Sequence, residues 1–226
     1  AAVAAALDRL VARQEAMAAG EGRWVAASRW NAAREAITGQ IAAYLAKHPA
    51  RFGMPKGELK SALKTSVDAA LFDAVFDALV ASGTLELRGE RARPAGAPWE
   101  PPRETMAALE RLEGELEGAG LAVPETAAWQ SKLGAAGVEV LSLGYFLGRL
   151  VRVSQELTYT ARQLESLRAK LAAHFAKKPA MTVADFKELS GVSRKYAVPL
   201  LEHSDRSGWT VRSGDERKAG GRLAGS

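Results

Sequence analysis

Apolar residues recur at helical spacing ahead of two similar short segments of the chain. The segment 46–50 (AKHPA) returns 130 residues later as 176–180 (AKKPA). Apolar side chains three and four positions apart share one face of a helix, so the stretch before each segment predicts an amphipathic helix. The residues on that face are Ala36, Ile37, Ile41, Tyr44 and Leu45 in the first copy and Leu164, Leu167, Leu171 and Phe175 in the second.

Both copies continue with the same order of predicted elements. A short helix, a longer helix and alternating strand residues around a charged turn follow, at 56–63, 68–82 and 85–90 in the first copy and at 183–189, 194–207 and 209–215 in the second. Three helices and a hairpin in about 65 residues are typical of a winged helix, in which helices two and three form a helix-turn-helix. Because a Ser or Thr oxygen can accept from the free amides of a helix start, Thr65 or Ser66 is expected to cap the first longer helix and Ser193 the second.

A degenerate third copy is expected between these two. Its helices are predicted at 103–117, 124–133 and 138–147, and its strands at 150–153 and 157–159. The first 30 residues resemble the back half of one more unit, with a helix over 1–18 and a wing around Gly20 and Gly22. The proline-rich segment 94–102 is the clearest linker.

The predicted fold is therefore mainly α-helical with small β-hairpins, arranged as tandem winged-helix modules. The predicted modules are a partial winged helix at 1–30, a winged helix at 31–95, a degenerate one at 96–160, a last winged helix at 161–219 and a tail at 220–226.

Composition agrees with helices and excludes several classes of protein. Apolar residues make up 47% of the chain and aromatic residues 7%, and alanine, the best helix former, is abundant. The absence of cysteine excludes disulfides and thiolate chemistry and fits a reducing cytoplasm. No apolar run reaches the roughly 18 residues that a membrane span needs. The chain does not begin with Met, so we expect a fragment of a longer protein.

Positive charge is concentrated at the end of the chain. Residues 161–226 hold 13 Lys and Arg against 7 Asp and Glu, whereas residues 1–160 hold 18 against 19. Concentrated basic charge is typical of a protein that binds a polyanion, although a basic tail can also serve solubility alone.

No catalytic or metal-binding constellation is found in the sequence. The three histidines, His48, His174 and His203, fit no metal-ligand spacing, and the phosphate-binding loop of a nucleoside triphosphatase (G-x-x-x-x-G-K-[ST]) does not occur. The string 202–205 (EHSD) holds hydrolase residue types, but adjacent positions on one helix point in different directions. The acidic residues of the third copy are read as a solvated helix face, with exclusion of nucleic acid as the alternative; they are Glu110, Glu113, Glu115 and Glu117.

The last module differs from the others in where its cations lie. Ser193, Arg194, Lys195 and Tyr196 open its third helix, where the partial positive charge of the helix start favours phosphate. The candidate RNA contacts are these four residues and the wing residues Arg212, Ser213, Asp215 and Arg217, beside which Lys218 adds a further cation. An acidic side chain there could accept from a base edge; the alternative is a salt-bridge network within the wing.

The third helix favours RNA over DNA as the ligand. After its first turn the helix is mostly apolar (196–201, YAVPLL) and lacks the Asn, Gln or Arg series that reads a DNA major groove. Contacts limited to a helix start and a wing suit a compact target such as an RNA hairpin loop. A DNA-binding regulator and a protein-interaction scaffold remain as alternatives.

The segment 182–202 (TVADFKELSGVSRKYAVPLLE), followed by Asp205, Arg206 and 212–217 (RSGDER), resembles the end of the bacterial selenocysteine-specific elongation factor. In that family tandem winged helices follow a GTPase, and the last one binds the mRNA hairpin, the selenocysteine insertion element, that recodes a UGA codon. The resemblance implies that Arg194, Lys195, Arg212, Asp215 and Arg217 meet the hairpin loop.

The same resemblance implies how the chain acts. A monomer without enzymatic activity of its own would hold the hairpin, the upstream modules would act as a spacer, and a region outside this chain would bind GTP and selenocysteinyl-tRNA at the ribosome. Tethering of this kind raises the local concentration of the delivered partner.

Overall fold

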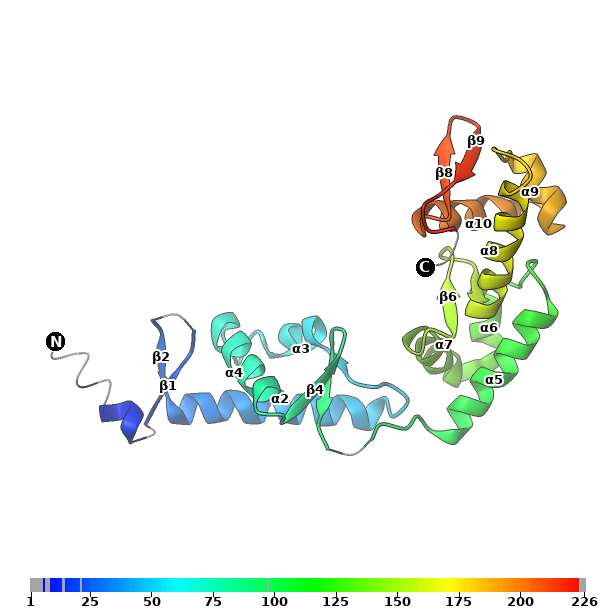
Figure 1. Cartoon of the computed structure of the whole chain (residues 1–226). Helices are drawn as coiled ribbons and strands as arrows, with labels where there is room; N and C mark the ends of the chain where they lie inside the picture. The colour runs from blue at the N-terminus through cyan, green and yellow to red at the C-terminus, as the bar shows by residue number, and fades with distance from the viewer. Residues whose placement is uncertain (1–5, 7–8, 14, 21, 97, 224–226) are drawn as a thin grey trace. The chain divides into compact units, whose positions relative to one another are not determined.

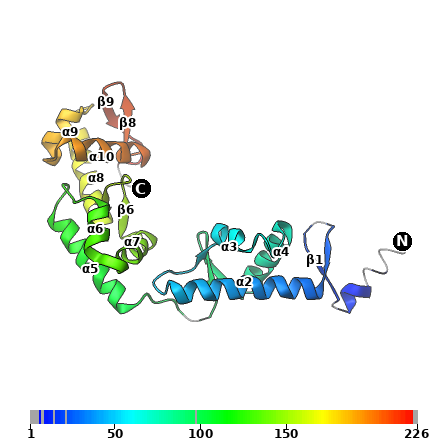
Figure 2. The ribbon, with the colours of Figure 1, turned by 180° about the vertical axis from the view of Figure 1, so that it is seen from behind.

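A computed structural model of the chain describes every residue except 1–5, 7–8, 14, 21, 97 and 224–226 (Figures 1 and 2). The residues form two compact units, Ala1–Pro102 and Arg103–Ser226. The division coincides with the end of the proline-rich segment 94–102 that the sequence predicts as a linker. In the described part of the chain, no helix has both the length and the apolar character needed to cross a bilayer.

The first unit is built on the long helix α2 (Ala27–Lys47), whose apolar face lies in the core. A hairpin precedes it, and two helices and a three-stranded antiparallel sheet of order β3-β5-β4 follow. These elements are β1 (Ala16–Ala18), β2 (Trp24–Ala26), β3 (Met54–Pro55), α3 (Lys56–Leu63), α4 (Ala69–Ala81), β4 (Leu85–Arg88) and β5 (Arg91–Pro94).

The second unit repeats the order of three helices and a hairpin twice. The first set comprises α5 (Arg103–Gly118), α6 (Thr126–Leu133), the short 3-10 helix η1 (Gly134–Ala136), α7 (Gly137–Phe146), β6 (Leu150–Arg152) and β7 (Thr158–Thr160). The second set comprises α8 (Ala161–Phe175), α9 (Val183–Ser190), α10 (Arg194–Arg206), β8 (Thr210–Ser213) and β9 (Glu216–Ala219). Both hairpins are antiparallel. The predicted fold class, mainly helical tandem winged helices, is confirmed by this element order.

The start of the chain departs from the prediction. The predicted helix over 1–18 is wrong at its end, because Ala16–Ala18 form strand β1 and pair with β2. Alanine-rich sequence favours a helix locally, but this hairpin buries Ala16 and Ala19. The predicted boundary between residues 30 and 31 falls inside α2. Residues 1–5, 7–8 and 14 of the predicted helix over 1–18 lie outside the described residues.

The end of the chain packs more closely than a tail would. The Gly220 amide donates to the Trp209 carbonyl at 2.8 Å, and the Arg222 amide donates to the Gly208 carbonyl at 3.0 Å. The Leu223 side chain is buried, and its carbonyl accepts from Arg168 Nε at 3.0 Å. Residues 220–223, predicted as a tail, therefore pack on the last winged helix.

The predicted helix caps are corrected by the structure. Neither Thr65 nor Ser66 caps α4; Asp68 does, and its carboxylate accepts from the Leu71 amide at 3.0 Å. That hydrogen bond is the main reason why the pKa of Asp68 lies below its usual value. Ser193 does stand at the cap position of α10, but its side chain accepts no capping hydrogen bond.

A capping box opens α9, the second helix of the last winged helix. Thr182 Oγ1 accepts from the Asp185 amide at 3.1 Å, and Asp185 Oδ2 accepts from the Thr182 amide at 2.9 Å and from the Thr182 hydroxyl at 2.6 Å. The hydrogen bonds from Thr182 lower the pKa of Asp185 to about 2. The carboxylate form of Asp185 is therefore bound more strongly in the folded chain than in the unfolded one.

We expect Asp185→Ala to lower the free energy of unfolding of the second unit by about 1 kcal/mol near neutral pH. Because the folded pKa is depressed, this contribution is present above the unfolded pKa near 4 and is lost as the pH falls toward about 2. Chemical unfolding of both chains across this pH range measures the difference. Glu188→Ala, at an exposed position of α9, is the control, and an Asp185→Ala deficit that persists unchanged at the acid end would contradict the assignment.

Candidate nucleic-acid interface

The first turn of α10 presents the predicted cations to solvent. Ser193, Arg194 and Lys195 are exposed, and Tyr196 is half-buried. The rest of the helix turns its apolar residues inward, with Ala197, Leu200 and Leu201 buried. Pro199 is tolerated inside the helix, which continues to Arg206. The chemistry that α10 offers to a ligand is therefore concentrated in its first turn, where free amides and two cations coincide.

The wing β8–β9 supplies the second group of candidate residues. Its register pairs Val211 with Lys218, Arg212 with Arg217 and Ser213 with Glu216, and Gly214 takes the left-handed conformation (φ 65°) in the turn. Arg212, Ser213 and Asp215 are exposed, and Arg212 Nε donates to the Gly214 carbonyl at 3.1 Å. Within the described residues, no hydrogen bond joins this turn to the first turn of α10.

Arg217 is the member of the predicted site that the structure removes from the surface. Its side chain is 7% exposed, and Nε forms an ion pair with Asp205 Oδ2 at 3.1 Å. Its backbone exchanges two hydrogen bonds with Met181, at 2.8 and 2.9 Å. The guanidinium is thus committed inside the winged helix, so the predicted RNA contact at Arg217 is corrected to a role in holding the wing. The salt-bridge alternative holds for this residue.

Asp205 is a supporting residue that sequence reasoning missed. Besides the ion pair with Arg217, its Oδ1 accepts from the Thr210 hydroxyl at 2.5 Å. One carboxylate near the end of α10 therefore binds both strands of the wing, since Thr210 lies on β8 and Arg217 on β9. The sequence did offer one indication of this role, because an acidic residue in the last turn of a helix precedes a hairpin rich in basic residues.

Lys195 contacts the preceding winged helix. Its Nζ lies 2.7 Å from Glu125 Oε1, at the start of α6, and 5.8 Å from the centre of the Tyr196 ring. The hydrogen bond to Glu125 raises the pKa of Lys195, so the amine stays charged. Both side chains are about half exposed, and an exposed ion pair of this kind holds its partners weakly.

The two winged helices of the second unit are joined by buried polar contacts around the β7–α8 junction. The Gln163 side-chain amide donates to the carbonyls of Leu116 and Gly120, and its oxygen accepts from the Thr160 amide at 2.8 Å. Thr160 Oγ1 accepts from the Gln163 amide at 3.1 Å, which completes a capping box at the start of α8. Arg206 Nη2 donates to the Val153 carbonyl at 2.7 Å.

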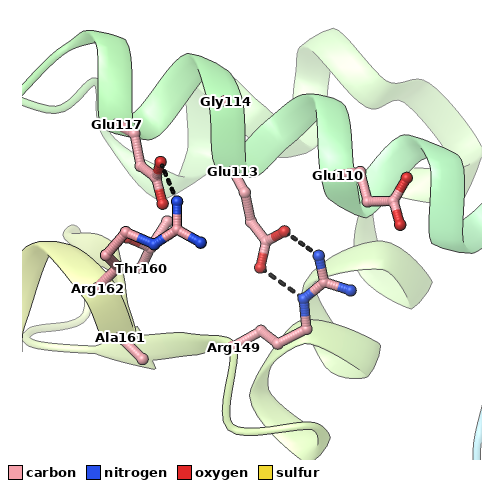
Figure 3. A pocket seen from close by; sticks show the side chains of 8 residues that line it. All are labelled: Glu110, Glu113, Gly114, Glu117, Arg149, Thr160, Ala161 and Arg162. Atoms are coloured by element: carbon pink, nitrogen blue, oxygen red, sulfur yellow. Dashed lines mark hydrogen bonds and ion pairs between the residues drawn. The ribbon is translucent and has the colours of Figure 1, made fainter.

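The acidic residues of α5 are largely paired with cations, which Figure 3 shows in part. Three of them, Glu110, Glu113 and Glu117, line a pocket of about 360 Å³ together with Arg149 and Arg162. Glu113 forms a two-point ion pair with Arg149, which raises the pKa of Arg149, and Glu117 lies 3.2 Å from Arg162. Glu115 pairs with Lys132, outside this pocket. Three of the four predicted surface acids thus bind neighbouring cations, and Glu110 stays exposed.

The pocket is lined by carboxylates and arginines, and no histidine lines it. In the described part of the chain, no group of three or more His, Asp or Glu side chains could hold a metal ion. His203 packs edge-on against Trp209 with ring centres 5.5 Å apart, and burial lowers its pKa. The exposed cations of the last winged helix are therefore the candidate site.

Comparison with known proteins gives two family matches and one curated relative. Residues 39–92 and 173–219 match two family models, each described as the winged helix of elongation factor SelB. A selenocysteine-specific elongation factor from Desulfomicrobium baculatum is 26% identical over 181 residues, which are 79% of this chain and 28% of that protein. The aligned part of the chain thus spans less than a third of this relative.

One solved structure shows a similar fold, and a second covers about half of the chain. The crystal structure of the bacterial selenocysteine-specific elongation factor EF-Sec superposes with a TM-score of 0.56 at 22% identity, covering 91% of this chain and 32% of that one. The mRNA-binding domain of elongation factor SelB from E. coli, solved in complex with SECIS RNA, covers 52% of this chain and 98% of that one at 21% identity. Its TM-score of 0.43 is too low to establish a common arrangement.

Proposed function

Because the chain is a winged-helix region of the elongation factor SelB family, we propose that its last winged helix binds an mRNA hairpin, the selenocysteine insertion element. The resemblance of residues 182–217 to that family is confirmed by the family match at 173–219. The contacts proposed are the first turn of α10, with Ser193, Arg194, Lys195 and Tyr196, and the wing turn, with Arg212, Ser213 and Asp215.

The observation that carries this proposal is the distribution of exposed charge on the last winged helix. Arg194 and Lys195 are exposed where the amides of α10 are free, and Arg212 is exposed at the wing turn. Beyond the first turn, α10 uses Ala197, Leu200 and Leu201 for the core. From Ala197 to Leu201 the helix carries no polar side chain, and beyond that it offers no Asn, Gln or Arg series to read a DNA major groove, whereas a hairpin loop brings phosphates and unstacked bases close together.

The remaining elements of the proposal concern the longer protein. Selenocysteine-specific elongation factors such as the Desulfomicrobium baculatum relative extend well beyond the part that aligns with this chain. We propose that a GTPase region outside this chain binds GTP and delivers selenocysteinyl-tRNA to the ribosome in the cytoplasm. This chain, as a monomeric and non-catalytic tether, keeps that region close to the UGA codon.

Competition between nucleic acids tests the proposal. The chain is bound to a UGA-proximal hairpin from a selenoprotein message of its own genome and challenged with unrelated duplex DNA or with a hairpin of shuffled loop sequence. We expect unlabelled copies of the same hairpin to displace it at equal concentration, and neither the duplex DNA nor the shuffled hairpin to do so. Displacement by duplex DNA at equal concentration would instead support a DNA-binding regulator. Binding that does not weaken as salt is raised would indicate a protein scaffold, because phosphate contacts are strongly salt-dependent.

A further inference from the structure

The wing of the first unit carries three arginines on one of its faces. Strands β4 and β5 contribute Arg88, Arg91 and Arg93, and their register places Arg88 opposite Arg91 and Glu86 opposite Arg93. Cross-strand partners share a face, and alternate residues along a strand do so too, so the three arginines lie together. We name this surface the arginine face. The opposite face of the hairpin holds buried Leu85 and Ala92.

The guanidinium groups of the arginine face are held by the loop that precedes β3. Phe52 is buried in that loop, and its ring centre lies 4.6 Å from the guanidinium carbon of Arg88 and 5.7 Å from that of Arg93. Arg91 Nη1 donates to the Gly53 carbonyl at 3.3 Å. A side chain at Gly53 would place its Cβ 2.5 Å from the Ala92 carbonyl oxygen, so glycine allows the loop to lie against β5. The arginines are therefore ordered before any ligand binds, which reduces the entropy lost on binding.

The charges of this face are only partly neutralised. Arg93 Nη1 pairs with Glu86 Oε1 at 3.0 Å. Arg88 is exposed, and among the described residues it contacts no carboxylate. Arg88 and Arg91 lie directly opposite each other, so two positive charges are adjacent on this face. A bound polyanion would be attracted to both.

We propose that the arginine face binds the phosphate backbone of RNA without sequence preference. Guanidinium groups match phosphate oxygens in two-point contacts. The exposed Arg88 and the half-buried Arg91 would make these contacts, while Arg93 stays paired with Glu86, and arginines on phosphate offer little to distinguish bases. The choice of RNA among polyanions rests on the proposed function of the last winged helix. On this account the first unit contacts RNA itself and is more than a spacer between the hairpin and the region that delivers tRNA.

The test starts from the full chain with Arg194→Ala and Arg212→Ala, which removes two of the proposed hairpin contacts. Fluorescence anisotropy at low salt measures binding of an RNA duplex of arbitrary sequence. Adding Arg88→Gln and Arg91→Gln should weaken this binding about 5- to 10-fold and lower the slope of log affinity against log salt by about 1 to 2. Lysine at both positions should restore most of the slope.

Two further measurements decide between explanations. Arg34→Gln with Lys64→Gln removes the same charge from exposed positions elsewhere in the first unit and should weaken binding less than about twofold. If this control weakened binding as much as Arg88→Gln with Arg91→Gln, RNA would respond only to the total charge of the chain, and the proposal would be overturned. Polyglutamate that competes as well as RNA would point to an acidic protein instead. Thermal unfolding should show that Arg88→Gln with Arg91→Gln still folds cooperatively, with only a small decrease in Tm from the lost contacts with Phe52 and Gly53. The hairpin competition above, made with the unaltered last module, tests the proposed function separately.

Discussion

The double substitution Arg194→Ala with Arg212→Ala is expected to lower the affinity of the chain for its mRNA hairpin at least about 100-fold, because each arginine loses charge-assisted contacts of about 1.5 to 3 kcal/mol. Both side chains are exposed, one in the first turn of α10 and one beside the wing turn, so their removal leaves the core untouched. Titration of labelled hairpin by anisotropy, at a fixed salt concentration near the physiological value, measures the effect.

Lys177→Ala with Lys187→Ala provides the matched control. These two lysines are exposed on the same winged helix but lie outside the first turn of α10 and the wing. The control removes the same net charge, and we expect it to weaken binding less than about threefold through long-range electrostatics. Equal losses in the two double variants would mean that the hairpin responds to the charge of the module and not to these contacts.

Asp205→Ala is expected to lower the free energy of unfolding of the second unit by about 2 to 3 kcal/mol. Removing one partner of a buried ion pair leaves the other charge uncompensated, at a cost of about 3 to 5 kcal/mol when both are fully buried. Arg217 is 7% exposed and Asp205 23%, so we expect somewhat less than the full cost. The substitution also removes the acceptor of the Thr210 hydroxyl. Urea unfolding followed by circular dichroism measures the change.

The exposed acid Asp215 offers the comparison. Asp215→Ala, at the wing turn, should change the stability by less than about 0.5 kcal/mol because surface substitutions rarely do more. If Asp205→Ala were as stable as Asp215→Ala, the ion pair that fixes the wing would be irrelevant to the fold. Arg217 would then be free to meet RNA as the sequence alone predicts.

Local sequence signals predicted most of the helices correctly. The short helix 56–63 was predicted at the bounds of α3, and α9 and α10 each differ from their predicted ranges by a single residue at the end. These helices have clear boundaries in the sequence, such as Gly191, which ends α9 in the left-handed conformation. The two-residue strand β3 carries no such periodic signal, and sequence reasoning missed it.

The candidate site was only partly predictable, because the positions and partners of some of its side chains depend on long-range contacts. Alternation shows that Arg212 and Arg217 belong to a wing, but which side chain turns toward α10 depends on the strand register and on partners such as Asp205 and Met181. The ion pair of Lys195 with Glu125 joins residues 70 positions apart. Neither contact leaves a local pattern. The helix start, in contrast, is a local feature, and its exposed cations were predicted correctly.

The chain's affinity for its hairpin, compared with that for the same hairpin with a shuffled loop, tests the central claim most directly. Both dissociation constants are measured on the unaltered chain at physiological salt, where non-specific binding is weak, roughly 10⁻⁴ to 10⁻⁶ M. We expect at least about a 100-fold preference for the cognate loop, because the shuffled loop loses two or more base or loop contacts at about 1 to 3 kcal/mol each. Equal dissociation constants for the two hairpins would contradict it.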